Sequence, residues 1–155
     1  MTTFKVIATN HTSFTVSDID RSLAFFRDAL GFEVTSKGPR SPSLIQAITG
    51  VEGAEVLIAY VRGPGHSIEL IEYIKPETRS SVRPQPCDTG FSHIAYDVDD
   101  IDAAIKAARD HSVEPIGPVV AIDQGRTAAA EWHTYEIPTA SLSNLSKKPE
   151  PRLSD

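Results

Sequence analysis

The 155-residue sequence contains a single cysteine, Cys87, which lies between Pro86 and Asp88 in a polar stretch. One cysteine cannot form an internal disulfide, and these surroundings do not favour a catalytic thiol. No apolar run approaches the roughly 20 residues that are needed to cross a bilayer. The first ten residues lack the basic and apolar segments of a secretory signal. We therefore expect a cytoplasmic protein without a membrane span.

Clusters of basic residues are also scarce. The chain has 15 Lys and Arg against 21 Asp and Glu, a formal net charge of −6, and its basic residues cluster only at Lys147 and Lys148. This balance argues against nucleic acid or anionic lipid as a partner and leaves a small-molecule substrate as the expected ligand. The length and the hydrophobic content of 40% fit one globular domain with a genuine core.

An internal repeat is the most informative feature that the sequence does contain. The stretch NHTSFTVSDID, residues 10–20, is echoed by SHIAYDVDDID, residues 92–102, so that His11 aligns with His93 about 82 positions later. Each copy alternates polar and apolar residues like a half-buried strand and then shows an Asp cap and helical spacing. Such self-similarity indicates a duplicated structural module.

The first copy predicts a strand, a helix and three further strands, separated by Gly- and Pro-rich turns such as GPRSPS at 38–43. A linker rich in Pro, Ser and Thr follows, and then the strand and helix patterns return. The expected elements of the first half lie at 10–16, 18–31, 32–37, 55–62 and 67–74, the linker at 75–90, and the repeated strand and helix at 91–98 and 99–112. Ser112 stands where a helix-ending glycine is expected.

These patterns predict an α+β fold of two tandem βαβββ modules, at about 8–75 and 90–140, within one domain over 1–140. Each module alone would leave a sheet face and an edge uncovered, so the two are expected to share one concave sheet. Open edges also favour burial against a second copy, which predicts a homodimer. Residues 141–155 are polar and contain prolines, and we expect them to be a disordered tail.

Candidate site residues follow from strand alternation. His11 and His93 lie opposite the helix-packing faces of their strands, so both are expected to project into the concavity. In SIELIEY, residues 67–73, Glu69 and Glu72 fall on opposite faces, so only one of them is expected at the site. Two imidazoles and one carboxylate on separate strands suit a divalent metal with open positions for water or substrate.

The segments HTSFTVSDIDRSLAFFRDALGFEV, GHSIELIEY and GFSHIAYDVDDIDAAI resemble the vicinal oxygen chelate superfamily over about residues 8–125. This superfamily includes glyoxalase I, methylmalonyl-CoA epimerase, extradiol dioxygenases, and fosfomycin and bleomycin resistance proteins. The resemblance implies His11, Glu69 and His93 as ligands of a divalent metal, Zn, Ni, Co, Mn or Fe, with Glu69 also catalytic. It further implies a fourth ligand, a glutamate on a closing strand that usually follows YLRDPDG.

The sequence departs from this pattern after residue 125, where it reads RTAAAEWHTYEIPTASLSNLSKKPEPRLSD without a DPDG motif. From the third base of the Trp132 codon, the degenerate codons for WHTYEIPTASLSNL permit AYLRDPDGITIEL in the shifted frame. We hypothesise that the tail is a frameshifted form of the usual ending, which the codons of the gene test. Pro138 lacks the amide donor of a strand, so the last strand of the second module is expected to be incomplete.

The resemblance implies a metal-dependent lyase or isomerase that acts on a small oxygenated substrate through an enediolate. Two other classes stay open. An iron-dependent ring-cleaving dioxygenase would use two histidines and a carboxylate as a facial triad, whereas a non-catalytic binding or resistance protein would use the concavity as a pocket. Loops are expected to select the substrate, and Arg40 in KGPRSPS is a candidate contact for an anion.

Overall fold

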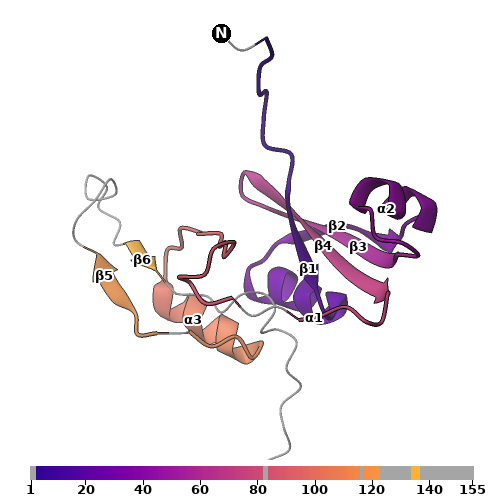
Figure 1. Ribbon diagram of the computed structural model, residues 1–155. Helices are drawn as coiled ribbons and strands as arrows, with labels where there is room; N and C mark the ends of the chain where they lie inside the picture. Colours follow the sequence, from indigo (N-terminus) through magenta and orange to yellow (C-terminus); the bar gives the residue numbers. More distant parts are fainter. Residues whose placement is uncertain (1–2, 82–83, 116, 123–133, 137–155) are drawn as a thin grey trace, which may run out of the picture. The chain divides into compact units, whose positions relative to one another are not determined.

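Strand pairing organises the part of the chain that its computed structural model describes, residues 3–81, 84–115, 117–122 and 134–136 (Figure 1). The chain divides into two units, Met1–Arg79 and Ser80–Asp155, each with a sheet of its own. Their boundary falls within the linker expected from composition. No helix in the described ranges is long and apolar enough to cross a membrane.

The first unit is a βαβββ module with one added helix between its second and third strands. The sheet order is β1-β4-β3-β2, with β1 parallel to β4 and the other pairs antiparallel. The predicted first module and the α+β class are confirmed. Its elements are β1 (Thr12–Val16), α1 (Ile19–Ala24), the π-helical turn η1 (Phe25–Ala29), β2 (Glu33–Pro39), α2 (Pro42–Thr49), β3 (Glu55–Gly63) and β4 (His66–Lys75).

Helix α1 covers one face of the sheet and contacts β3 and β4. Asp18 caps this helix as predicted, because its carboxylate accepts a hydrogen bond from the Arg21 N–H at 2.9 Å. Apolar side chains on this side are almost completely removed from water, which stabilises the unit. The buried residues of α1 and of the strand face beneath it include Ile19, Leu23, Val61, Ile68 and Leu70.

The opposite side of the sheet, called the open face below, carries α2 at one end. Ile45 of α2 is buried in a cluster with Ala54, Val56 and Ile58. The sequence pattern predicts a turn over 38–43, but β2 continues to Pro39 and α2 begins at Pro42. Proline in the first turn and a left-handed glycine after the last turn, here Gly50 with φ of 73°, are typical helix boundaries.

The second unit repeats the capped helix of the first. Helix α3 (Ile101–Asp110) begins after Asp100, whose carboxylate accepts a hydrogen bond from the Ala103 N–H at 2.9 Å. Ser112 has a left-handed φ of 60°, which is the conformation that favours glycine, so the expectation for this position is also met. The Asp cap at the start of the helix and the left-handed residue after its end are therefore present in both halves.

The strand that should precede α3 is different. Residues 91–98, expected to repeat β1, form no strand, and this prediction is wrong. In the first unit β1 pairs only with β4, and the counterpart of β4 would come from the sequence after residue 125, most of which lies outside the described residues. Residues 91–98 therefore have no strand partner within the described ranges.

The described ladder of the second unit is antiparallel and joins β5 (Val120–Ile122) to β6 (Thr134–Glu136). The paired residues of β6 are followed closely by Pro138, the position at which the strand is expected to stop. Pro138 itself, the remainder of the predicted closing strand and the predicted tail over 141–155 lie outside the described residues.

Gly63 at the end of β3 provides a test of packing. A Cβ atom at this position would overlap the ring of the buried Phe32, so no side chain fits without moving that ring. We predict that Gly63→Ala lowers the free energy of unfolding by about 1–3 kcal/mol, as overpacking does. Gly38→Ala is the matched control, because the nearest atom to its added Cβ would be 3.8 Å away. Urea denaturation measures both variants, and equal stability would contradict this account.

Candidate functional site

His11 and Glu69 come together on the open face because β1 and β4 run in parallel. The strand register places Ser13 opposite Glu69, and His11 shares the face of Ser13 two residues earlier. The His11 Nε2 atom lies 3.4 Å from the Glu69 Oε2 atom, and the two side chains are 32% and 12% exposed. The structure thus brings together the two predicted site residues of the first unit.

Glu72 lies on the opposite face, as alternation predicts. Its Oε2 atom accepts a hydrogen bond from the Ile19 N–H at 2.9 Å, at the beginning of α1. A carboxylate at this position satisfies one of the amide groups that a helix N-terminus leaves unpaired. Glu72 therefore acts on the helix, and Glu69 is the glutamate of SIELIEY that faces the site.

Tyr60 of β3 contacts both His11 and Glu69 and was not among the predicted site residues. Its hydroxyl donates a hydrogen bond to Glu69 Oε1, and its ring lies edge-on to the His11 ring with 5.6 Å between centroids. The β3–β4 register places Tyr60 directly opposite Glu69. The alternation of EVLIAYVR was the available signal, since it puts Tyr60 on the same side as Val56 and Ile58.

The environment of Tyr60 raises the pKa of its hydroxyl to about 12. Burial is the largest cause, because it disfavours the charged phenolate, and the hydrogen bond to Glu69 and the charge of that carboxylate act in the same direction. The positive charge of Arg40 lowers the Tyr60 pKa in opposition. The phenol therefore stays protonated at neutral pH and remains a hydrogen-bond donor to Glu69.

The other nitrogen of His11 is held by its neighbour. His11 Nδ1 lies 2.6 Å from Asn10 Oδ1, so the amide oxygen accepts a hydrogen bond when Nδ1 carries the proton. In the neutral imidazole this leaves a lone pair on Nε2, the atom that faces Glu69. A hydrogen bond to the non-ligating nitrogen is the usual way in which proteins orient a metal-binding histidine.

The resulting donor set fits a divalent metal. Donor atoms about 2.1 Å from one ion, at angles between octahedral and tetrahedral, lie roughly 3.0–3.4 Å from each other. The separation of 3.4 Å between His11 Nε2 and Glu69 Oε2 falls within that range. Because Tyr60 occupies Glu69 Oε1, the carboxylate presents its second oxygen to the imidazole.

His93, the third predicted ligand, belongs to the second unit. It is exposed in the segment that forms no strand, and its ring centroid lies 6.4 Å from that of Phe91. Among the described residues, no group of three or more His, Cys, Asp or Glu side chains is placed to hold a metal ion. The part of His93 in the site therefore stays a prediction, and the predicted closing-strand glutamate lies outside the described ranges.

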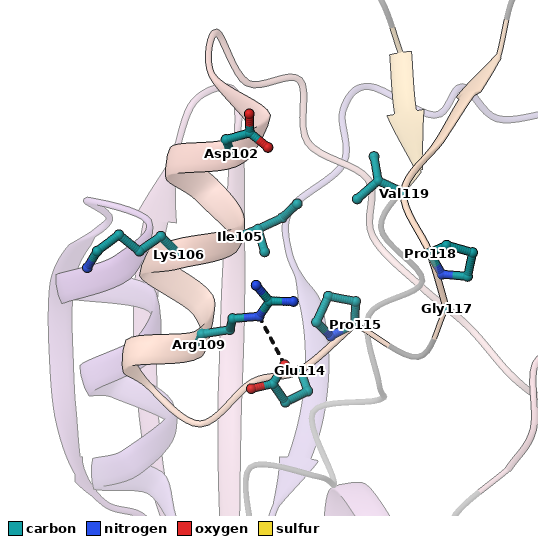
Figure 2. A pocket seen from close by; sticks show the side chains of 9 residues that line it. All are labelled: Asp102, Ile105, Lys106, Arg109, Glu114, Pro115, Gly117, Pro118 and Val119. Carbon is teal, nitrogen blue, oxygen red and sulfur yellow. Dashed lines mark hydrogen bonds and ion pairs between the residues drawn. The ribbon is translucent and has the colours of Figure 1, made fainter.

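The second unit also contains a hollow of about 550 Å³ between α3 and the segment that follows it (Figure 2). Two of its cations are paired: Arg109 Nε lies 3.1 Å from Glu114 Oε2 of the lining, and Lys106 Nζ lies 2.6 Å from Asp110 Oδ2 on the same helix. It brings together no metal-type donor pair like that of the open face. Its lining residues are Asp102, Ile105, Lys106, Arg109, Glu114, Pro115, Gly117, Pro118 and Val119.

Comparison with known families identifies the group to which this arrangement belongs. A family model described as the Glyoxalase/Bleomycin resistance protein/Dioxygenase superfamily matches residues 10–130. The chain belongs to this superfamily. The match includes both copies of the internal repeat and ends near the point where the sequence loses the usual closing motif.

Two curated proteins illustrate the relationship within the glyoxalase superfamily. A 2-epi-5-epi-valiolone epimerase from an Actinomyces species is 31% identical over 154 residues, which cover 92% of this chain and 80% of that protein. The protein YaeR of Escherichia coli strain K12 is 33% identical over 105 residues, which cover 68% of this chain and 71% of YaeR.

Solved structures confirm the predicted glyoxalase-like fold. A glyoxalase family protein from Bacillus cereus has a TM-score of 0.71 and 26% identity, over 79% of this chain and 83% of that one. The fosfomycin resistance protein FosX from Listeria monocytogenes, solved with Mn(II) and sulfate, has a TM-score of 0.52 and 14% identity, over 76% and 82% of the two chains. The likeness to FosX is one of fold alone.

Because Tyr60 donates a hydrogen bond to Glu69, we predict that replacement of Glu69 changes the pKa of the Tyr60 phenol. In the metal-free protein, Glu69→Gln should lower the Tyr60 pKa from about 12, because the carboxylate charge is lost, but burial should keep it above the ordinary value of about 10. Ultraviolet titration of tyrosinate measures the pKa, and the absorbance change that is missing in Tyr60→Phe identifies the titration of Tyr60. An unchanged titration in Glu69→Gln would contradict the proposed contact.

The same shift has a consequence for stability. The Tyr60 pKa is higher in the folded chain than in the unfolded one, so protonated Tyr60 favours folding below about pH 10. That contribution should be lost as the pH rises through about 12.

Proposed function

We propose that this member of the glyoxalase superfamily is a divalent-metal-dependent isomerase of the epimerase type that acts on a small oxygenated substrate. The observation that carries the proposal is the pair of donor atoms on the open face, His11 Nε2 and Glu69 Oε2, 3.4 Å apart. The 31% identity with an epimerase supports isomerisation over the lyase reaction.

The proposed ligands of the metal, Zn, Ni, Co, Mn or Fe, are His11, Glu69 and His93. The geometry of the first unit supports His11 and Glu69, and the internal repeat of the sequence supports His93. When bound, a divalent cation would act as a Lewis acid that polarises substrate oxygens and stabilises the charge of an enediolate.

The residues of the chain itself prepare this chemistry. Asn10 Oδ1 accepts a hydrogen bond from His11 Nδ1 when that nitrogen carries the proton, and the Nε2 lone pair of the neutral ring then faces the site. Tyr60 holds one oxygen of Glu69 by its hydrogen bond and leaves the other directed at His11. An epimerase must take a proton from the carbon beside a carbonyl group and return one to its other side. We assign Glu69 the role of catalytic carboxylate in addition to its role as a ligand.

Metal binding is the first test of this proposal. His11→Ala, Glu69→Gln and His93→Ala should each weaken divalent-metal binding at least tenfold, measured by equilibrium dialysis with metal analysis. Glu72→Gln is the matched control, because Glu72 lies on the same strand but bonds to the start of α1. It should leave metal affinity unchanged and lower only thermal stability. Unchanged affinity in all three site variants would refute the site.

Activity distinguishes the classes of function. The metal-loaded protein, incubated with small cyclic and linear hydroxyketones in deuterium oxide, should introduce deuterium beside the carbonyl and invert that centre, as followed by NMR. Chelation of the metal should abolish the exchange. Oxygen uptake on catechols would instead show a dioxygenase. Stabilisation by a ligand without any metal dependence would show a binding protein.

We also propose that the chain forms a homodimer. The strands β1 and β2 are the two edges of the sheet in the first unit, and unpaired edges favour burial against another chain. Light scattering at micromolar concentration should give twice the mass of the chain. A monomer under these conditions would count against the proposal.

A further inference from the structure

Arg40 lies at the border of the open face, directly after β2. Its side chain is partly buried, and its guanidinium lies back over Gly38, with an N–H nitrogen 3.8 Å from the position of an added Cβ. Gly38 pairs with Ile58, whose side chain belongs to the open face. Directly opposed residues of antiparallel strands share a face. The Arg40 guanidinium therefore lies beside the open face, next to Gly38.

The position of Arg40 also brings its charge close to the candidate metal site. The guanidinium acts electrostatically on the hydroxyl of Tyr60, the residue that donates to Glu69 and contacts His11. Four groups thus share one region: an imidazole, a carboxylate, a phenol and a guanidinium. Of these, Arg40 has no part in holding the metal donors.

Arg40 has no carboxylate partner among the described residues of the chain. Its guanidinium donates a hydrogen bond of 3.2 Å to the Pro39 carbonyl oxygen, and no carboxylate of the described residues lies within 4.0 Å of it. Four other cations of the first unit, three on the sheet and one on η1, are paired with carboxylates, although the chain has an excess of acidic groups. These pairs are Arg27–Asp28, Lys37–Asp20, Arg62–Glu33 and Lys75–Glu55.

We propose that Arg40 binds an anionic group of the substrate, a carboxylate or a phosphate, and holds it at one end of the open face while the reacting carbon lies beside His11 and Glu69. A guanidinium presents its N–H groups as a planar fork that matches both anions. This inference rests on the proposed function and adds to it a substrate class, a small hydroxyketone that carries an acid group.

Inorganic phosphate is a probe that separates this inference from the proposed reaction. The experiment uses the metal-free protein and follows the Nε–H signal of Arg40 by NMR during phosphate titration. The signal should shift in a saturable manner. Arg40→Gln should weaken phosphate binding at least tenfold, and Arg40→Lys should weaken it less, because lysine keeps the charge but lacks the fork.

Arg62→Gln is the matched control for this titration. Arg62 lies on β3 two residues beyond Tyr60, so it shares that side of the strand, but it is paired with Glu33 at 4.0 Å. Its replacement should leave phosphate affinity unchanged. Absence of saturable binding to the native protein, or an equal loss in Arg62→Gln and Arg40→Gln, would overturn the inference.

Turnover provides an independent measurement. For a neutral hydroxyketone and its phosphate monoester, Arg40→Gln should raise KM for the monoester at least tenfold and leave KM for the neutral compound unchanged. An active enzyme whose KM for the monoester is unaffected would overturn the assignment of Arg40 but keep the proposed function. Phosphate binding through Arg40 without any turnover would overturn the proposed function but keep the anion site.

Discussion

The parallel pairing of β1 with β4 is the constraint on which the first unit depends. Parallel neighbours cannot be joined by a tight turn, so the chain must leave β1, cross one face as α1 and return through β2 and β3 before β4 can pair. The register of this pair brings His11 to Glu69 on the open face and Glu72 to the start of α1 on the other. The contact of Glu72 with α1 and the pairing of His11 with Glu69 are therefore consequences of one strand register.

Alternation within SIELIEY was sufficient to separate Glu69 from Glu72, because the side-chain direction in a strand depends only on position. Alternation places Tyr60 on the same side of β3 as Val56 and Ile58, but its contact with Glu69 depends on the register between β3 and β4, which is not a local property. Helix α2 was not predicted for another reason: proline and glycine are common both in turns and at helix ends.

The second half shows which parts of a repeat can be predicted from a short window. Asp100 caps α3 as Asp18 caps α1, because each cap needs only the next three residues. A strand at 91–98 needs a partner from much further along the chain, where the sequence departs from the family ending. The family model matches as far as residue 130. Within the described ranges, residues 91–98 have no such partner.

Helix α2 occupies the connection between β2 and β3 and takes no part in the hydrogen bonds of the sheet. Its buried contribution to the open face is Ile45. The connection can therefore be lengthened, shortened or replaced without shifting the register that aligns His11 with Glu69. The dimensions of the open face and the pairing of His11 with Glu69 can change separately during evolution, so the proposed substrate pocket can vary while the proposed metal donors stay in place.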